Sequence, residues 1–504
     1  MKTYENFINP FFLIFFMSKE SDKYEKLGFK CGLEIHQQLD TNKLFCNCPS
    51  VLRTDEPDFI VTRKLHAIAG ETGEVDIAAA FQAVQNKEFV YQAYKDTTCL
   101  VELDEEPPHE INLEALQIAL QIALLLNCKI QPITQIMRKT VVDGSNTSGF
   151  QRTVMIARDG FIETSFGKVG IEAVYLEEDS ARPVSKKDSE KAEKQIVYRL
   201  DRLGIPLVEI ATNPDIKTPE QAKEAALIIG DILRSCKVKR GIGTIRQDVN
   251  MSIKGGNRVE IKGMQDMKIF LKVLENEVLR QKKLISENKK VSSEVRNALP
   301  DGSTEFLRPM PGSARMYPET DLPLLKIHRN LINEVKKNLP KLRKKEAEEL
   351  RKKGLNNDMI KLLFKQNKLN EFKDLLKIID NPQLIAKVLL MYPKEISKRK
   401  EMSSEEFERI FNFDVLAFVL ESVKNKKISE KDIKQVLEKI AEGKSLKESI
   451  KIEKIDIKNI EKKIMDTIKN NPGLSANAYM GIIMKEFKGK ISGQEAMQII
   501  KKHL

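Results

Sequence analysis

Two residues with chemically active side chains stand two positions apart near the start of the chain. Glu34 and His36 lie in the segment Gly-Leu-Glu-Ile-His, whose pattern predicts a β-strand. Successive side chains of a strand point to opposite faces, so a carboxylate and an imidazole at this spacing share one face. Such a pair can bind a metal ion or move a proton. A surface pair with satisfied hydrogen bonds is the alternative interpretation of these two residues alone.

Further carboxylates lie in or beside other apolar runs. Glu177, Glu178 and Asp179 are consecutive at the end of a predicted strand, and such a cluster is electrostatically costly without a cation or a basic partner. Glu209 is the charged residue of the otherwise apolar run 206–210, where a carboxylate normally binds a partner or a ligand. These acids therefore predict bound cations or paired basic groups.

Acidic and basic residues alternate on two more predicted strands. Arg246, Asp248 and Asn250 occupy every second position of one strand, and Glu260 and Lys262 do so on the next. Strands that each contribute a carboxylate, with basic side chains among them, fit a concave site for divalent cations and nucleotide phosphates better than random surface charge. The chain contains no P-loop, dinucleotide-binding fingerprint or kinase signature, so a nucleotide would need another kind of cradle.

A second candidate metal site rests on cysteines. Cys46 and Cys48 are spaced as in some zinc knuckles, but the usual second C-x-x-C pair is missing. Cys99 is the later cysteine that could join them, and Asp96 could supply a fourth ligand. A packed loop of free thiols explains the same residues more simply than zinc does.

The acids and bases require an α+β framework that brings them together. Residues 24–325 combine short β-branched runs, glycine and proline punctuation and a few amphipathic helices, which predicts a catalytic cradle domain around a mixed sheet. We expect helices over 115–126 and 218–236, the second with Thr218 as its N-cap and Pro219 in its first turn.

The rest of the chain has a helical pattern. We expect an all-α helical domain over 326–425 and a helical tail domain over 426–504. Ser403 and Glu406 predict a capping box at the start of one of these helices.

Composition and the N-terminus narrow the class of protein further. The 504 residues suffice for about three domains, and 41% hydrophobic with 31% charged residues exclude collagen, low-complexity disorder and a polytopic membrane protein. Six cysteines without regular spacing favour a reducing compartment, so we expect a cytoplasmic protein. Residues 1–23 are interpreted as an N-terminal extension, with translation beginning at Met17, because the apolar run before it is too short to span a membrane.

Positive charge is concentrated in the C-terminal third. The formal net charge is +12, and residues 331–504 contain 39 basic and 26 acidic residues, so the remainder is close to neutral. Clustered lysines and arginines attract the phosphates of nucleic acids. Lysines on ordinary solvated helices are the alternative explanation.

Six motifs, in the same order, resemble those of the kinase/transamidase subunits of tRNA-dependent amidotransferases, the GatB/GatE family. The chain is more similar to the archaeal GatE type than to the bacterial GatB type, from about residue 24 to the C-terminus. The motifs are GLEIHQQLD (32–40), KLFCNC (43–48), LVELDEEPPH (100–109), LEEDSAR (176–182), DRLGIPLVEI (201–210) and LRPMPGSARMYPETD (307–321).

The resemblance implies a reaction in two steps. Members of this family phosphorylate the side-chain carboxylate of glutamate attached to tRNA(Gln), using ATP and Mg²⁺, and then replace the phosphate with ammonia. The basic helical part would bind Glu-tRNA(Gln). An asparaginase-like amidase, GatD, would supply the ammonia within a heterotetramer of two GatD and two GatE chains.

The resemblance also implies roles for the acids and bases described above. The metal ligands would be Glu34, His36 and Glu178. The further catalytic candidates are the acids of neighbouring strands, Glu177, Glu209, Asp248 and Glu260. The groups that bind ATP and its phosphates would be Arg246, Lys262 and Asn250.

The chain departs from the family pattern in two places. Archaeal GatE chains usually carry a domain related to one in bacterial aspartyl-tRNA synthetase, but only residues 282–295 lie where it would be inserted. The chain is therefore a reduced form that would lack any tRNA contact made by this domain. The second departure is the incomplete cysteine set, which falls short of the bacterial-type zinc site.

Three other functions stay open. A bacterial GatB-type chain would act on both Asp-tRNA(Asn) and Glu-tRNA(Gln), although Gln37, Gln38 and the motif at 308–321 speak against it. A non-catalytic tRNA-binding scaffold would not need the whole acidic set. An ATP-dependent ligase for a free metabolite would not need the basic helical part.

Overall fold

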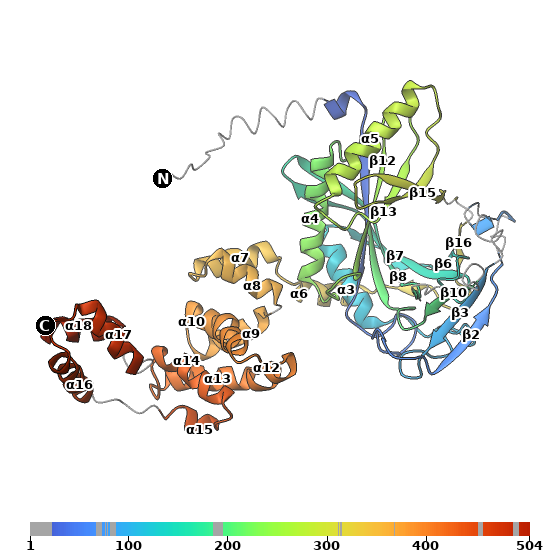
Figure 1. The fold of residues 1–504 in the computed structure, drawn as a ribbon. Coiled ribbons are helices and arrows are strands. Elements are labelled where there is room, and N and C mark those ends of the chain that lie inside the picture. The colour runs from blue at the N-terminus through green and yellow to red at the C-terminus, as the bar shows by residue number, and fades with distance from the viewer. Residues whose placement is uncertain are drawn as a thin grey trace. The chain divides into compact units, whose positions relative to one another are not determined.

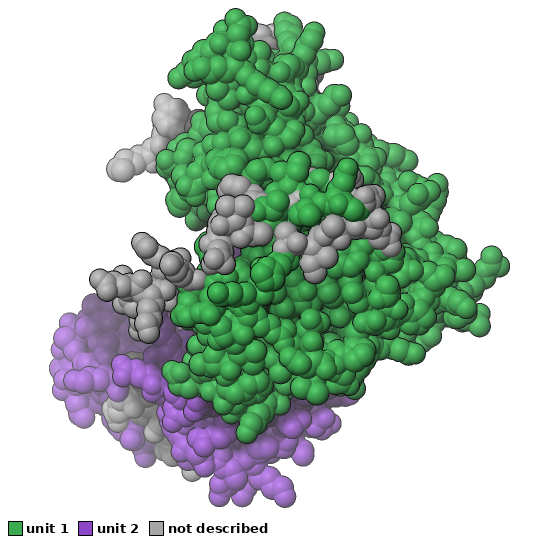
Figure 2. Space-filling view, turned by 90° about the vertical axis from the view of Figure 1, so that its right-hand side faces the viewer, with its two compact units in different colours: residues 1–345 green, residues 346–504 purple. Residues whose placement is uncertain are grey.

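The protein consists of two compact units, residues 1–345 and 346–504 (Figure 2). The predicted N-terminal extension, apart from Lys23, and the alternative start at Met17 lie outside the residues that the structure describes. The computed structural model describes residues 23–66, 73–75, 77, 79–80, 87–184, 195–310, 312, 315–366, 368–451, 457–486 and 493–503.

An eleven-stranded sheet is the framework of the first unit (Figure 1). β13 and β14 pair in parallel, whereas the neighbouring pairs are antiparallel, so the sheet is mixed as predicted. A short strand, β4 (Lys129–Ile130), pairs with β7 outside the main order. From edge to edge the order is β15 (Thr304–Pro309), β14 (Glu294–Ala298), β13 (Val259–Lys262), β12 (Ile245–Ser252), β1 (Lys30–Gln38), β11 (Pro206–Thr212), β8 (Gly167–Glu178), β7 (Phe150–Thr164), β6 (Ile136–Thr140) and β16 (Met316–Pro318).

The central strands have two chemically different faces. In β1, Leu33 and Ile35 are buried in the apolar core, and the alternation of a strand directs Glu34 and His36 to the other face. β11 repeats this pattern around Glu209. The apolar face packs against three helices, α3 (Leu113–Leu125), α4 (Pro219–Ser235) and α5 (Phe270–Ser286).

Two of these helices confirm the sequence-based expectation. The predicted helices over 115–126 and 218–236 are α3 and α4. Thr218 caps α4 by accepting a hydrogen bond from the amide of Gln221, and Pro219 occupies the first turn. Their positions leave the opposite face of the sheet available for polar side chains.

The two edge strands of the large sheet are joined by a short piece of chain. β15 ends at Pro309 and β16 begins at Met316, seven residues later. Seven extended residues reach at most about 25 Å, whereas the ten strands of the main order would cover about 43 Å if the sheet were flat. The sheet must therefore curl so that its edges approach each other, which makes it a cradle (Figure 1).

Two smaller sheets complete the first unit. One contains β2 (Phe59–Arg63), β3 (Glu88–Ala93), β10 (Gln195–Arg199) and β9 (Arg182–Pro183), and the other pairs β5 (Ile133–Thr134) with β17 (Leu325–Lys326). At the end of the unit, α6 (Arg329–Lys337) packs against α3. The α+β class predicted for the chain is confirmed.

The C-terminal unit is helical in its described residues. α7 (Arg343–Lys352) crosses the division between the two units. The elements that follow are α8 (Asn357–Lys365), α9 (Leu369–Ile378), α10 (Pro382–Ala386), a π-helix (Lys387–Met391), α11 (Tyr392–Arg399), α12 (Ser404–Ile410), α13 (Phe413–Lys424), a 3₁₀ turn (Glu430–Asp432), α14 (Ile433–Ala441), α15 (Leu446–Ser449), α16 (Ile457–Asn470), α17 (Ala476–Glu486) and α18 (Gly493–His503).

This unit contains two apolar cores. One includes buried residues between 350 and 440, and the other includes buried residues between 464 and 500. The predicted boundary at 425 falls between α13 and α14, which share the first core. The predicted capping box at Ser403 and Glu406 is confirmed at the start of α12. Of the helices described, none has the length and apolar character needed to cross a membrane.

Candidate active site

A hollow of about 710 Å³ opens on the polar face of the curled sheet. Its walls come from seven consecutive strands of the sheet, from β6 to β13 with both included. β15 and the start of β16 also contribute. It therefore collects residues that are distant in sequence. The charged side chains and the histidine that line it are Glu34, His36, Lys139, Glu172, Glu177, Asp179, Glu209, Arg246, Asp248, Arg258, Glu260, Lys262, Arg308 and Arg315.

The strand register explains why these side chains meet. His36 in β1 lies opposite Glu209 on one side and opposite Arg246 on the other. Glu34 likewise lies opposite Asp248. Residues in register on adjacent antiparallel strands have side chains on the same face and about 5 Å apart at Cβ. The register thus brings the acids and bases of three strands into one row.

His36 lies among three carboxylates. Its Nε2 atom is 3.3 Å from Glu209 Oε2, 3.5 Å from Glu177 Oε1 and 3.8 Å from Glu34 Oε1. Burial alone would lower the pKa of His36, but the hydrogen bond to Glu209 and the charges of the three acids outweigh it and raise the pKa to about 9. In the absence of a metal ion, the imidazole is therefore protonated at neutral pH.

The acids around His36 differ in their affinity for protons. Burial, followed by the charge of Glu209, raises the pKa of Glu34 to about 7. Burial also acts to raise the pKa of Glu209, but the charges of Lys139 and His36 hold it well below its usual range. Glu209 is therefore the permanently charged member of this group.

A second ion-paired group lies on β12 and β13. Lys262 Nζ is 2.7 Å from Asp248 Oδ2 and 2.7 Å from Glu260 Oε1. Arg246 donates to Asp179, a fully buried carboxylate that also accepts from Gln38 Nε2 at 2.6 Å. Lys262 and Arg246 are thus fixed at the hollow by carboxylates on neighbouring strands or loops.

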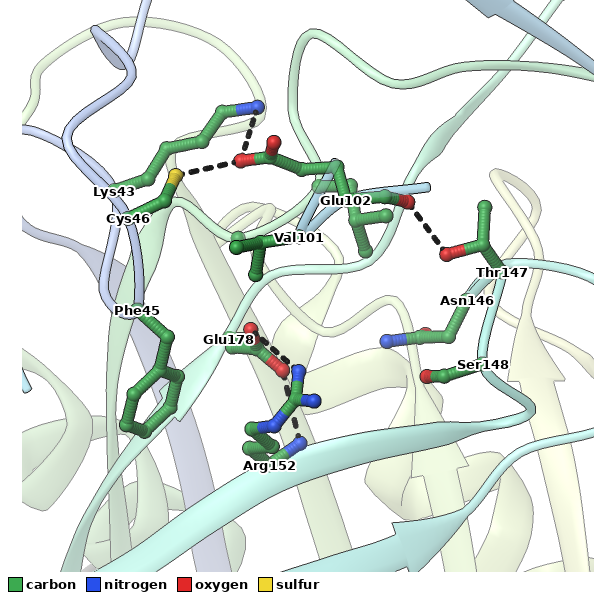
Figure 3. Close-up of a pocket in the computed structure, with 12 residues that line it drawn as sticks. Lys43, Phe45, Cys46, Val101, Glu102, Asn146, Thr147, Ser148, Arg152 and Glu178 are labelled. Carbon is green, nitrogen blue, oxygen red and sulfur yellow. Dashed lines mark hydrogen bonds and ion pairs between the residues drawn. The ribbon is translucent and has the colours of Figure 1, made fainter. Parts of the chain in front are cut away.

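The expected metal ligand Glu178 lies apart from Glu34 and His36. Glu177 and Glu178 are consecutive in β8, so their side chains point to opposite faces, and Glu177 is the one that faces His36. Glu178 instead accepts from the amide of Arg152 at 3.1 Å, in a separate small pocket (Figure 3). The side chain of β8 that shares the hollow with Glu34 and His36 is therefore Glu177, and Glu178 lines the other pocket.

Asn250, expected among the phosphate-binding residues, also lies outside the hollow. It pairs in register with Gly32 and Glu260, on the same strand face as Arg246 and Asp248. Among the described residues, however, the side chains that line the hollow do not include Asn250. The alternation of β12 places it on the correct face, but too far along the strand.

Lys139, which was not predicted from the sequence, neutralises the centre of the acidic group. Its Nζ atom is 3.4 Å from Glu177 Oε2 and 3.4 Å from Glu209 Oε2. Lys139 follows Arg138 in β6, and one lysine in a basic strand carries no signal that it faces acids. Arg258, Arg308 and Arg315 were also missed, although the last two lie in the motif at 307–321.

The predicted cysteine group is brought together with an unexpected fourth member. The ligand atoms of Cys46, Cys48, Cys99 and Glu102 all lie within 4.8 Å of one another. Cys46 Sγ is 2.8 Å from Glu102 Oε1. Figure 3 marks this contact with a dashed line between the two side chains. The other expected member, Asp96, forms an ion pair with Arg53 instead. Because Glu102 follows Cys99 by three residues, a C-x-x-E spacing was the signal in the sequence.

The geometry of the hollow suits a divalent metal ion and a phosphate group. Two overlapping sets of ligand atoms, one from Glu34, His36 and Asp248 and one from His36, Glu177 and Glu209, each lie within 4.8 Å of one another. Carboxylate oxygens are preferred ligands of Mg²⁺, and fixed cations beside them can stabilise charge on a transferring phosphoryl group. A site of this kind is characteristic of enzymes that carry out metal-dependent phosphoryl transfer.

The sequence of residues 29–333 matches the GatB/GatE catalytic domain. The match covers almost all of the first unit and includes every residue of the hollow. The chain belongs to the GatB/GatE family.

Curated relatives are similar to this chain over nearly its whole length. The E subunit of the glutamyl-tRNA(Gln) amidotransferase of Methanocaldococcus jannaschii is 38% identical, with 95% of this chain and 99% of the relative aligned. The E subunit of the Methanosarcina barkeri enzyme is 34% identical, with 96% and 99% aligned. The first alignment extends over 634 residues, more than the 504 of this chain, so the relative contains segments that this chain lacks. This agrees with the predicted reduced form, in which residues 287–293 alone connect α5 to β14.

Proposed function

We propose that this chain is the amidating component of a glutamyl-tRNA(Gln) amidotransferase, which converts Glu-tRNA(Gln) to Gln-tRNA(Gln) with ATP. The observation that carries the proposal is the single hollow in which His36, Glu177 and Glu209 meet Lys262 and Arg246, within the matched catalytic domain. Full-length similarity to archaeal E subunits supports the choice of substrate. The hollow contains both the acids and the bases that the reaction needs, and a scaffold that only binds tRNA would not need them.

The proposed magnesium ligands are His36 with Glu177 and Glu209, together with Glu34 and Asp248 on the adjoining side. The donors fit, because they form two sets of three that share His36, and within each set the ligand atoms lie within 4.8 Å of one another. When bound, Mg²⁺ would screen the repulsion between the substrate carboxylate and ATP. Glu178 has no part in this set.

The chain's own residues would orient the two anions and stabilise the charge that moves between them. An oxygen of the glutamate side chain attacks the γ-phosphorus of ATP, ADP leaves, and an acyl phosphate forms. Lys262 and Arg246, each fixed by carboxylates, would stabilise negative charge on the phosphoryl oxygens. Ammonia then attacks the acyl carbon, and phosphate leaves with one oxygen of the former carboxylate.

The other parts of the assembly are proposed on the same basis. Glu-tRNA(Gln) would be bound with help from the second unit, which has most of the excess positive charge. An asparaginase-like GatD chain would supply ammonia, in an assembly of two GatD and two GatE chains. The family relationship supports both proposals.

We also propose zinc bound by Cys46, Cys48, Cys99 and Glu102. Three thiol groups and one carboxylate are a complete tetrahedral set for zinc, and a shift of about 1 Å in each atom would bring them to bonding distance. Such an ion would tie the loop after β1 to the loop after β3 and have no part in the chemistry.

The function is tested by the amino acid recovered from the tRNA. The full-length chain and its amidase partner are incubated with ATP, Mg²⁺, asparagine or glutamine, and Glu-tRNA(Gln). We expect glutamine after deacylation, and neither glutamine nor tRNA-dependent ATP hydrolysis with His36→Ala. The tRNA affinity of this variant should stay within a few fold. Recovery of glutamate alone from the unaltered complex would contradict the proposal.

A further inference from the structure

Three arginines line the hollow without a role in the proposed catalytic set. Arg258 directly precedes β13 and continues the alternation of Glu260 and Lys262 on that strand. Arg308 lies on β15, at one edge of the curled sheet, and Arg315 directly precedes β16, at the other edge. Basic groups therefore reach the hollow from both edges of the sheet.

The other cations of the hollow already have carboxylate partners. Lys139, Lys262 and Arg246 are each ion-paired with acids of the sheet or its loops. By contrast, neither Arg258 nor Arg315 has a carboxylate oxygen within 4.0 Å among the residues that the structure describes. The Nε of Arg315 donates to the backbone oxygen of Thr140 at 3.2 Å, which fixes its guanidinium group beside the strand of Lys139.

The charges of Arg308 and Arg315 act on one acid of the hollow, Glu260. Burial would raise the pKa of Glu260, but Lys262 and then Arg308 and Arg315 lower it. Arg308 and Arg315 therefore lie close enough to Glu260 to act on any ligand bound beside it.

The chemistry of the arginines selects the kind of ligand. Guanidinium groups present parallel N–H donors that match phosphate oxygens in bidentate geometry. The carboxylates of β1, β8 and β11 would repel a polyphosphate unless cations lay along its other side. A hollow of about 710 Å³ is within the usual range for a site that encloses a small molecule.

We propose that Arg258, Arg308 and Arg315 bind the polyphosphate chain of the nucleotide, while the acids of β1, β8 and β11 bind the metal ion and face the reacting carboxylate. The inference rests on the proposed function and adds to it the residues that recognise the nucleotide's phosphates. It also gives a role to the motif at 307–321, whose two arginines the proposed catalytic set does not use.

The test compares nucleotide binding by the unaltered chain with that of Arg308→Gln and Arg315→Gln. Equilibrium binding to the full-length chain is measured with Mg²⁺ for ATP and for inorganic tripolyphosphate, and for AMP by competition. We expect at least tenfold weaker binding of ATP and tripolyphosphate by each variant, and AMP affinity within about twofold. Unchanged tripolyphosphate affinity, or an equal loss for AMP, would overturn the inference.

Matched variants separate phosphate binding from folding and from general charge. Arg158→Gln removes an exposed arginine of β7 that does not line the hollow, and should leave tripolyphosphate affinity unchanged. Arg308→Lys and Arg315→Lys keep the positive charge but lose the paired N–H donors of the guanidinium group. They should therefore bind tripolyphosphate at least threefold more weakly than the unaltered chain. If the glutamine variants misfold, the lysine variants provide the test instead. Folded lysine variants that bind tripolyphosphate as tightly as the unaltered chain would overturn the inference.

Different results would contradict the proposed function and the role of the arginines. If the unaltered chain binds no ATP, the proposed function is contradicted and this inference with it. If the unaltered chain binds ATP and the arginine variants bind it equally well, the inference alone is overturned.

Discussion

At the residue scale, the protonation state of His36 changes the net charge of the hollow. With Glu209, Glu177 and Glu34 within 3.8 Å, its protonated form is stabilised and its pKa is raised to about 9. A protonated imidazole cannot bind a metal ion. Metal binding at this position therefore competes with a proton, and the two states of the site differ in charge.

This competition predicts a pH dependence of Mg²⁺ binding. Between pH 7 and 9 the affinity should rise with pH, because fewer imidazole groups must lose a proton, and binding near pH 7.5 should release about one proton. Calorimetry in buffers of different ionisation enthalpy measures this release. His36→Gln should remove most of this release and leave the smaller part that Glu34 contributes, whereas His109→Gln, at an exposed histidine outside the hollow, should leave it unchanged. Affinity independent of pH in this range would contradict the assignment of His36 as a ligand.

The cysteine group gives a second prediction at this scale. Elemental analysis of the purified chain should find about one zinc per molecule. Glu102→Gln should weaken its retention during dialysis against a chelator, because the carboxylate is replaced by a poor ligand. Asp96→Asn is the matched control, since Asp96 pairs with Arg53 and not with the thiols. Equal retention by both variants would rule out Glu102 as a ligand.

At the element scale, β1 separates the core from the site by alternation. Ile35 is fully buried in the apolar core, whereas its neighbour Glu34 faces the hollow with a raised pKa. Ile35→Ala should lower the free energy of unfolding of the first unit by about 2–5 kcal/mol. Glu34→Gln should leave it unchanged or raise it at pH 8, because the costly buried charge is removed. Urea unfolding at pH 8 measures both, and similar losses for the two variants would contradict the assigned faces.

The same alternation explains which parts of the site the sequence could predict. Glu34 with His36, and Arg246 with Asp248, were correctly placed on shared faces, because period two is a property of any strand. The choice between Glu177 and Glu178 could not be made this way. Consecutive residues at a strand end are equivalent until the register with neighbouring strands is known.

Other residues were missed because distant segments bring them together. Lys139 reaches Glu177 and Glu209 only because β6 and β11 lie on the same curled sheet. Arg308 and Arg315 meet at the hollow because the sheet curls, and curling is not visible in the pattern of a single strand. The general class, α+β with a helical C-terminal part, followed from local periodicity alone.

At the scale of the whole molecule, the catalytic charges lie in the first unit, whereas most of the excess positive charge lies in the second. The second unit has 33 basic and 25 acidic residues, a net charge of +8 out of the total of +12, and its lysines are suited to binding phosphates. Replacing Lys462, Lys469 and Lys501, which are exposed on α16 and α18, with glutamine should weaken tRNA binding. The slope of log affinity against log salt should become less steep by about 0.7–0.9 for each phosphate that is no longer neutralised.

Filter binding over a series of salt concentrations checks this expectation. Lys168→Gln and Lys129→Gln, at exposed lysines of the first unit, are suitable controls and should leave the slope unchanged. An unaltered slope in the triple variant would show that these lysines are ordinary solvated surface.

The proposed reaction depends on one hollow that brings the glutamate carboxylate and ATP together, so that phosphate passes directly between them. It is tested most directly with Glu-tRNA(Gln) whose side-chain carboxylate carries ¹⁸O, incubated with the complete enzyme, ATP, Mg²⁺ and an ammonia donor. The phosphate released with each glutamine formed should contain one ¹⁸O atom from the substrate. Glutamine formation with phosphate free of ¹⁸O would contradict it.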